Sequence, residues 1–241
     1  MTTYAVWRRR TISIVKTQRM TISGLDYIPR RGAVILAPNH LNWKDIFLLA
    51  AMIPRQIHFV ATYELFDAHR CASYAADYMA QRLGKWCKVP ATALSQSLGR
   101  LISHRVRALG AIPVKRGGLV KRMFSAVEAG LKSGQVVCIF PEGGTGVTGR
   151  LREFKKGLSK VVLDLWNDGN RLVPVLPIAI TGTDAILCPC RRLFIRIAPP
   201  LHIGKYISDS QNETLNRFTR KLRDEVARLL SESHPHVSVS H

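Results

Sequence analysis

Acidic residues are scarce in this chain of 241 residues, which has 16 aspartates and glutamates against 36 lysines and arginines and a formal net charge of +20. Long hydrophobic runs are also missing, since an uncharged apolar stretch such as Ile46–Pro54 extends over only nine residues. A membrane-spanning helix needs about 18 or more apolar residues. No apolar segment follows the basic run Arg8–Arg10, as it would in a secretory leader. We therefore expect neither a membrane span nor a signal peptide.

Several motifs of metal and nucleotide chemistry are absent too. The five cysteines form no C-x-x-C pair, and one residue separates Cys188 from Cys190, a poor spacing for zinc. We expect reduced thiols and no metal site. No G-x-S-x-G elbow is present, which argues against a serine hydrolase. Arg150 stands where a Walker A loop requires Lys followed by Ser or Thr.

The positive charge is concentrated between Asp77 and Glu128, where fifty consecutive positions hold no acidic residue. The basic residues of this segment are Arg82, Lys85, Lys88, Arg100, Arg105, Arg107, Lys115, Arg116, Lys121 and Arg122. Such a field attracts an anionic bilayer, nucleic acid or phosphorylated ligands. Nucleic-acid surfaces interleave aromatic side chains with basic ones, and only Tyr78, Trp86 and Phe124 occur here. This composition argues against nucleic acid as the partner.

Short apolar runs bounded by turn residues alternate with helical patterns along the chain. We expect strands at 33–37, 57–62, 111–114, 135–140, 172–180, 193–197 and 201–203, and helices at 45–53, 67–110, 120–131, 154–166 and 215–229. This alternation predicts a single α/β domain, a sandwich in which helices flank a largely parallel sheet. We expect a basic N-terminal arm at 1–23 that ends in a short strand, a domain at 24–230 with a helical insertion at 67–110, and a disordered tail at 231–241.

The basic helix expected near 91–109 has two interpretations. Its leucines and Ile102 gather on one side of a helical wheel, opposite Arg100, His104 and Arg107, while Arg105 intrudes on the apolar side. The apolar stripe either packs on the core, as in an ordinary surface helix, or lies in a membrane interface.

His40 and Asp45 form the first candidate site, between the buried strand 33–37 and the following helix. Ligands of α/β sheets sit at the carboxyl ends of strands, and the first turn of the helix can bring the Asp45 carboxylate back to the imidazole. A carboxylate that accepts from Nδ1–H leaves Nε2 free as a base. The alternative is a turn histidine followed by a helix N-cap.

Glu142, Gly143, Gly144 and Thr145 form the second candidate site, after the buried strand 135–140. Glycines let backbone N–H groups approach an anionic ligand. Lys115 and Arg116 follow another strand and add two cations to this set.

The glycines of the same turn also satisfy G-x-G-x-x-G, at Gly144, Gly146 and Gly149. A dinucleotide fold needs an acidic residue about 20 positions on, at the end of a second strand. Asp164 and Asp168 fall instead within or at the end of an expected helix. We therefore expect no dinucleotide cofactor.

Four short blocks together resemble the glycerolipid acyltransferases, the family of 1-acylglycerol-3-phosphate acyltransferases, over about residues 20–205. The blocks are His40-x4-Asp45, Lys115–Arg116–Gly117, Phe140–Pro141–Glu142–Gly143 and Val173–Pro174–Val175–Leu176–Pro177. The resemblance implies that His40 is the general base and that Asp45 orients it. It also implies that Arg116 holds the acceptor's phosphate, that Glu142 helps to form the acceptor site, and that no cofactor is needed.

The third block departs from the family pattern, because Gly144, Thr145 and Gly146 follow where the family usually has a phosphate-binding arginine. Arg150 or Arg152 could replace it, or the acceptor could lack an exposed phosphomonoester. The run Gly146–Gly149 is similar to members that reacylate lysophospholipids.

The resemblance implies transfer of an acyl chain from acyl-CoA or acyl carrier protein to a hydroxyl of a lysophospholipid or lysophosphatidic acid. We expect a peripheral protein on the cytoplasmic face of an anionic membrane. The alternative is a non-enzymatic basic protein that binds anionic lipid or nucleic acid.

Overall fold

The computed structural model describes residues 3–15, 19–83, 93–114, 120–145, 150–169, 171–183 and 192–232. Its helices are α1 (Thr3–Val15), α2 (Lys44–Met52), α3 (Ala68–Leu83), α4 (Ala93–Ala108), α5 (Val120–Lys132), α6 (Gly157–Asn167) and α7 (Gln211–Glu232). Its strands are β1 (Met20–Ser23), β2 (Val34–Pro38), β3 (Ile57–Thr62), β4 (Ile112–Val114), β5 (Val136–Cys138), β6 (Val175–Thr181) and β7 (Leu193–Ile197). Short 3-10 turns occupy η1 (Leu25–Tyr27), η2 (Tyr63–Phe66) and η3 (Ile203–Tyr206).

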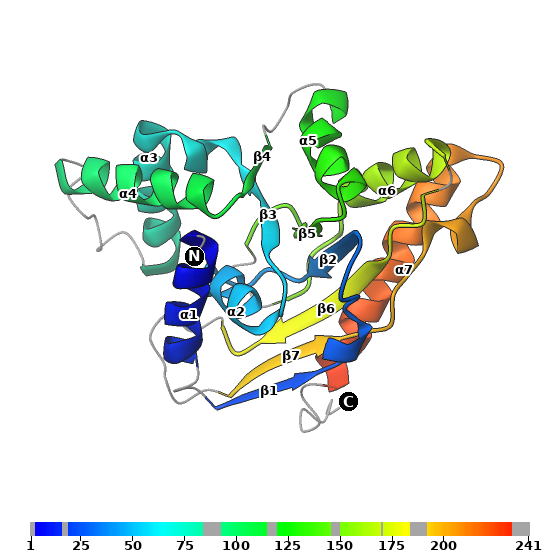
Figure 1. Cartoon of the computed structure of the whole chain (residues 1–241), viewed down its shortest axis with the longest axis horizontal. Coiled ribbons are helices and arrows are strands. Elements are labelled where there is room, and N and C mark those ends of the chain that lie inside the picture. Colours follow the sequence, from blue (N-terminus) through cyan, green and yellow to red (C-terminus); the bar gives the residue numbers. More distant parts are fainter. Residues whose placement is uncertain are drawn as a thin grey trace.

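The strands form one seven-stranded sheet in the order β1-β7-β6-β2-β5-β3-β4 (Figure 1). All neighbouring pairs run parallel except β6 and β7. Only eleven residues separate the end of β6 from the start of β7, and a parallel crossover needs about a dozen or more. The expected α/β fold with a largely parallel sheet is confirmed.

Both faces of the central strands β2, β5 and β6 are buried, which explains why these strands are nearly continuous apolar runs. Along β2, Ile35 and Ala37 face the hydrophobic cluster formed with α5, α6 and α7. Val34 and Leu36 face the cluster formed with α2. Figure 1 shows α5, α6 and α7 to one side of the central strands and α1 and α2 to the other.

The N-terminal segment differs from the expected arm, because Thr3–Val15 forms α1 and only Met20–Ser23 is a strand. This stretch has no strong apolar stripe, because three consecutive arginines interrupt it, and the β-branched residues that follow are weaker helix formers. Tertiary contacts stabilise it instead. The Ile57 N–H donates to the buried Tyr4 hydroxyl at 3.2 Å, and Arg8 Nε donates to the Ala50 carbonyl in α2 at 3.1 Å.

The helical insertion consists of α3 and α4, which pack tightly on each other. A Cβ added at Gly99 would lie 2.3 Å from the Ala68 carbonyl oxygen, so the two backbones approach closely there. Gly99 and Ser103 are buried in this contact, whereas Leu101 is 50% exposed beside exposed Arg100 and Arg105. α4 is therefore a packed helix that still presents an apolar residue and cations to solvent.

Three smaller expectations need correction. Instead of a strand at 201–203, Leu201 makes a single antiparallel bridge to Val175, and a 3-10 turn starts at Ile203. The preceding Pro199–Pro200 has no N–H groups with which to extend a ladder. α6 starts at Gly157 and not at residue 154, and α7 extends to Glu232. The remainder of the expected tail, 233–241, lies outside the described residues.

None of the helices in the described part of the chain combines the length and the hydropathy required to span a bilayer.

Candidate active site

Three adjacent strands position the candidate site. β2 lies between β5 and β6, and both pairs are parallel, so the three carboxyl ends meet at one edge of the sheet. His40 follows β2, Glu142 follows β5 and Thr183 follows β6. Figure 1 shows these strands in the centre of the sheet.

Asp45 anchors the imidazole of His40. The distance from His40 Nδ1 to Asp45 Oδ2 is 2.9 Å, and the exposed fractions of the two side chains are 12% and 0%. The N–H groups of Leu41 and Asn42 donate to the same oxygen at 2.7 and 2.8 Å, and Thr183 Oγ1 donates to Oδ1 at 2.5 Å. These donors compensate a buried carboxylate for its lost water. An ionised Asp45 places the proton on Nδ1 and leaves Nε2 as the basic nitrogen.

The alternative reading of Asp45 as a helix N-cap is wrong in position. The N-cap of α2 is Trp43, which makes no side-chain cap, and Asp45 lies inside the first turn. From there its carboxylate reaches back to the turn that carries His40, which is the geometry that the first interpretation required.

Phe140 sets the plane of the His40 ring. The two rings are stacked, with centroids 3.9 Å apart and an angle of 23° between their planes. Together with the bond to Asp45, this contact restricts both rotation and tilt of the imidazole.

Glu142 ties the turn after β5 to the turn after β2. Its Oε1 accepts the backbone N–H of His40 at 2.8 Å, and its Oε2 accepts that of Arg152 at 3.2 Å. Burial raises the pKa of the Glu142 carboxyl, and the two N–H donors partly oppose this shift. The structure therefore gives Glu142 a positioning contact with His40, and its part in binding the acceptor stays a prediction.

The glycine turn offers fewer free donors than its sequence suggests. The Gly143 N–H already donates to the Phe140 carbonyl at 3.1 Å. Within the described residues, the N–H groups of Gly144 and Thr145 have no such partner. These two groups, and not that of Gly143, remain candidates for binding an oxyanion.

Lys115 and Arg116, the predicted phosphate ligands of the second block, lie outside the described residues. β4 ends at Val114, and its pairing with β3 is parallel, so its carboxyl end lies at the same edge of the sheet as the candidate site.

Comparison with known proteins identifies the family. Residues 19–80 and 76–181 match the acyltransferase family, and this span includes His40, Asp45 and Glu142. The chain belongs to the acyltransferase family.

Two relatives show how far the family likeness extends. A 1-acyl-sn-glycerol-3-phosphate acyltransferase of Cocos nucifera is 26% identical over 208 residues, which cover 84% of this chain and 55% of the relative. The chain thus spans about half the length of that curated relative. The crystal structure of the 1-acyl-sn-glycerophosphate acyltransferase from Thermotoga maritima matches with a TM-score of 0.64 and 21% identity, covering 98% of this chain and 80% of that chain. This likeness confirms the acyltransferase fold.

Sequence reasoning missed three contacts of this acyltransferase site. Thr183 donates to Asp45, Phe140 stacks on His40, and the Asn39 amide bonds both backbone groups of Ile180 in β6, at 3.0 and 2.7 Å. Phe140 begins the third block, where it was given no role, and Asn39 directly precedes the first block. A polar residue just after a buried strand was the available indication for Thr183.

Two of the cysteines lie within the described residues, and both Cys71 and Cys138 are buried free thiols. Burial raises the pKa of the Cys138 thiol well above its usual value, and the negative charge of Asp45 adds to the effect. A neutral thiol is a poor nucleophile. Cys138 packs in the hydrophobic core, and we assign it no chemical role. Cys87, Cys188 and Cys190 lie outside the described residues.

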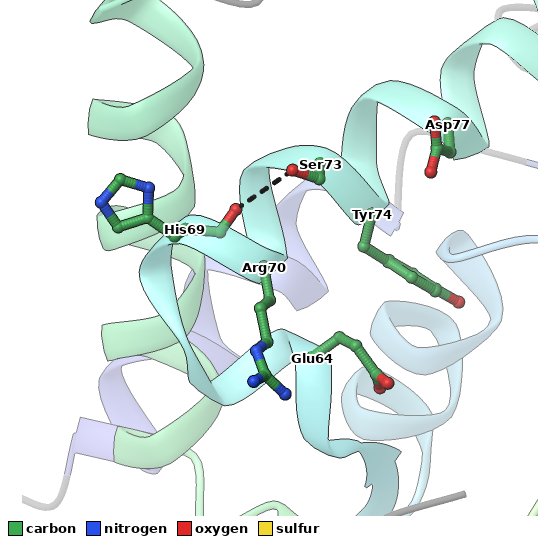
Figure 2. A pocket seen from close by; sticks show the side chains of 6 residues that line it. All are labelled: Glu64, His69, Arg70, Ser73, Tyr74 and Asp77. Carbon is green, nitrogen blue, oxygen red and sulfur yellow. Dashed lines mark hydrogen bonds between the residues drawn. The ribbon is translucent and has the colours of Figure 1, made fainter.

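A cavity of about 370 Å³ opens elsewhere, along η2 and the first turns of α3 (Figure 2). It is lined by Glu64, His69, Arg70, Ser73, Tyr74 and Asp77. Its charges are used locally, since Glu64 accepts from Thr62 and Arg70 lies over the Tyr63 ring. His69 points away from the other lining residues, and its carbonyl accepts from Ser73. None of the residues of the candidate active site lines this cavity.

Proposed function

We propose that this chain transfers a fatty acyl group from an acyl thioester to a hydroxyl of a lysophospholipid or of lysophosphatidic acid. The observation that carries the proposal is the 2.9 Å contact between His40 Nδ1 and the buried Asp45, at the carboxyl ends of the central parallel strands. The names of the coconut and Thermotoga relatives, both acyltransferases of glycerophosphate lipids, support the choice of acceptor.

In the proposed reaction, His40 Nε2 takes the proton of the acceptor hydroxyl as its oxygen attacks the thioester carbonyl. Asp45 stabilises the imidazolium that forms, as the carboxylate does in hydrolase triads. The tetrahedral intermediate then expels the thiolate, which takes the proton from His40. Ester, free thiol and neutral His40 result, so the proton balance is closed. We propose the N–H groups of Gly144 and Thr145 as the donors that receive the oxyanion.

The donor is either acyl-CoA or an acyl carrier protein, since both present the same thioester to the base. The acceptor carries its hydroxyl next to a phosphate ester. Lys115, Arg116 and Glu142 are the residues that we propose for the acceptor site.

We further propose that the protein works as a peripheral protein on the cytoplasmic face of a membrane. Trp43 is 45% exposed and Phe47 is 37% exposed, and their rings meet edge to face 5.3 Å apart, next to the His40–Asp45 turn. Aromatic side chains of this kind favour the membrane–water interface. The net charge of +20 favours an anionic surface.

The test is an assay of thiol release by the purified chain, with acyl-CoA or acyl carrier protein as donor and a panel of lysolipids as acceptors. Transfer that is abolished by His40→Ala supports the proposal. Binding of anionic lipid without thiol release from either donor would instead support the alternative of a non-enzymatic basic protein, which the charge alone favours.

A further inference from the structure

The side chain of Lys155 lies directly on Gly143, the glycine that follows Glu142. A Cβ added at Gly143 would lie 2.9 Å from the Cδ, Cε and Nζ atoms of Lys155. Gly143 has a φ of +70°, a conformation that favours glycine. The positive φ favours glycine here, and the end of the Lys155 side chain occupies the space that a Cβ at 143 would fill.

The backbone holds Lys155 at this turn. Its N–H donates to the carbonyl of Pro141 at 2.8 Å, and the preceding Phe154 is buried in the core. The Arg152 N–H, three residues earlier, donates to Glu142. The segment before α6 is thus tied at two points to the turn that contacts His40.

The charge of Lys155 is not neutralised within the described residues, where no acidic side chain pairs with it. The acids of the Gly143 turn and of the segment before α6 are engaged elsewhere. Glu142 is buried and accepts two backbone N–H groups, and Glu153 pairs with Arg223 at 3.3 Å. The next lysine, Lys156, points its ammonium to Asn212 in α7 at 2.8 Å.

We propose that Lys155 binds a phosphate ester of the substrate at the Glu142–Gly143 turn. An ammonium is a point charge that suits phosphate oxygens, and this one lies against the turn whose Glu142 contacts the backbone of His40. Arg150 and Arg152 are exposed as well, and the Arg152 guanidinium contacts the Thr145 carbonyl at 3.5 Å. The inference rests on the proposed acyl transfer, for which it names a substrate contact.

This ammonium could bind a phosphate of either substrate, the acceptor or the pantetheine-carrying donor. Steady-state kinetics of Lys155→Met with lysophosphatidic acid and acyl-CoA distinguish them. The matched control is Lys156→Met, which removes the same charge one residue away. Loss of a charged hydrogen bond predicts a rise of about 10- to 100-fold in one KM. The acceptor KM rises if the acceptor phosphate is bound, and the donor KM rises if the donor phosphate is bound.

Two further measurements test whether the effect of Lys155→Met comes from a lost contact between a cation and a phosphate. Lys155→Arg should restore most of the affinity, because it keeps a cation at the turn. With monoacylglycerol, which has the hydroxyl but no phosphate, an acceptor contact predicts equal kcat/KM for the parent and Lys155→Met. The proposal is overturned if both KM values of Lys155→Met stay within about twofold of the parent, or if Lys156→Met has the same effect.

Equilibrium binding separates this inference from the proposed function. Calorimetry with short-chain lysophosphatidic acid and with coenzyme A needs no turnover. If the parent binds one of them, and Lys155→Met loses that binding while Lys156→Met keeps it, the phosphate site stands even without acyl transfer. Transfer with unchanged binding in Lys155→Met would remove the phosphate site and leave the proposed function intact.

Discussion

The hydroxyl of Thr183 donates a hydrogen bond to Oδ1 of Asp45 at 2.5 Å, across 138 positions of the sequence. Thr183 follows β6, and Asp45 lies in the first turn of α2, the helix that follows the neighbouring strand β2. The bond therefore links the end of β6 to the helix after β2. Because Oδ2 is occupied by His40 and two backbone N–H groups, the threonine completes the hydrogen bonding of a fully buried carboxylate.

Thr183→Val should weaken both stability and turnover. Valine keeps the shape but leaves a buried carboxylate oxygen without its donor, which costs about 1–3 kcal/mol. A lower Tm and a lower kcat with an unchanged acceptor KM are expected, whereas Thr183→Ser should behave like the parent. Thermal unfolding and steady-state kinetics give both quantities. If Thr183→Val equals Thr183→Ser in kcat, the hydroxyl does not position the Asp45–His40 pair.

His40→Ala should abolish transfer while the protein remains folded. Loss of a general base lowers the rate about 10²–10⁴-fold. The His40 side chain is partly exposed to solvent, so its removal should cost little packing energy. The control is His104→Ala, at an exposed histidine of α4. Thiol release measures the rate and circular dichroism checks the fold. Turnover near that of the control would exclude His40 from the chemistry.

Glu142→Gln should change the pH dependence of stability. Burial raises the pKa of Glu142 in the folded state above its ordinary value of 4.5. The folded state therefore holds this proton more tightly than the unfolded state, and its contribution is fully present below about 4.5 and is lost as pH rises through the folded pKa. Urea unfolding from pH 4 to 7 should show the parent losing stability relative to Glu142→Gln as pH rises. A difference that is flat or rises with pH would contradict the raised pKa.

Binding to vesicles should depend on the cations of α4. Arg100 and Arg105 are exposed, while Arg107 donates to the Phe66 carbonyl and is best left unchanged. Changing Arg100 and Arg105 to Gln should reduce sedimentation with anionic vesicles. High salt should do the same, because the Debye length falls from about 8 Å at physiological ionic strength to about 3 Å at 1 M.

The matched control for this test removes two exposed cations of α7, Arg217 and Arg220, and Figure 1 shows α7 on the opposite side of the view from α4. Equal losses in the two double variants would show that net charge, and not the α4 surface, attracts the protein to lipid. No loss in either variant would move the contact to the exposed aromatic residues Trp43 and Phe47.

The sequence by itself determined most of the strands and helices and the first pair of the candidate site. The apolar run 33–37 became a strand because both faces of the central sheet are covered. His40 and Asp45 are only five positions apart, and the first turn of α2 brings the Asp45 carboxylate back to the imidazole. Their contact therefore depends on local structure. Glu142 and its glycines were found for the same reason, as a turn directly after a buried strand.

Only the tertiary structure decided which distant residues complete the site. Thr183, Phe140 and Lys155 reach it because β6 and β5 flank β2 and because the segment before α6 folds back on the Gly143 turn. The tertiary structure also decided that α1 forms, because contacts with α2 stabilise a segment whose helical pattern is weak. Strand order and helix packing depend on contacts between residues far apart in the chain. The spacing of apolar residues indicates only which positions of one helix or strand are buried, so it does not predict those contacts.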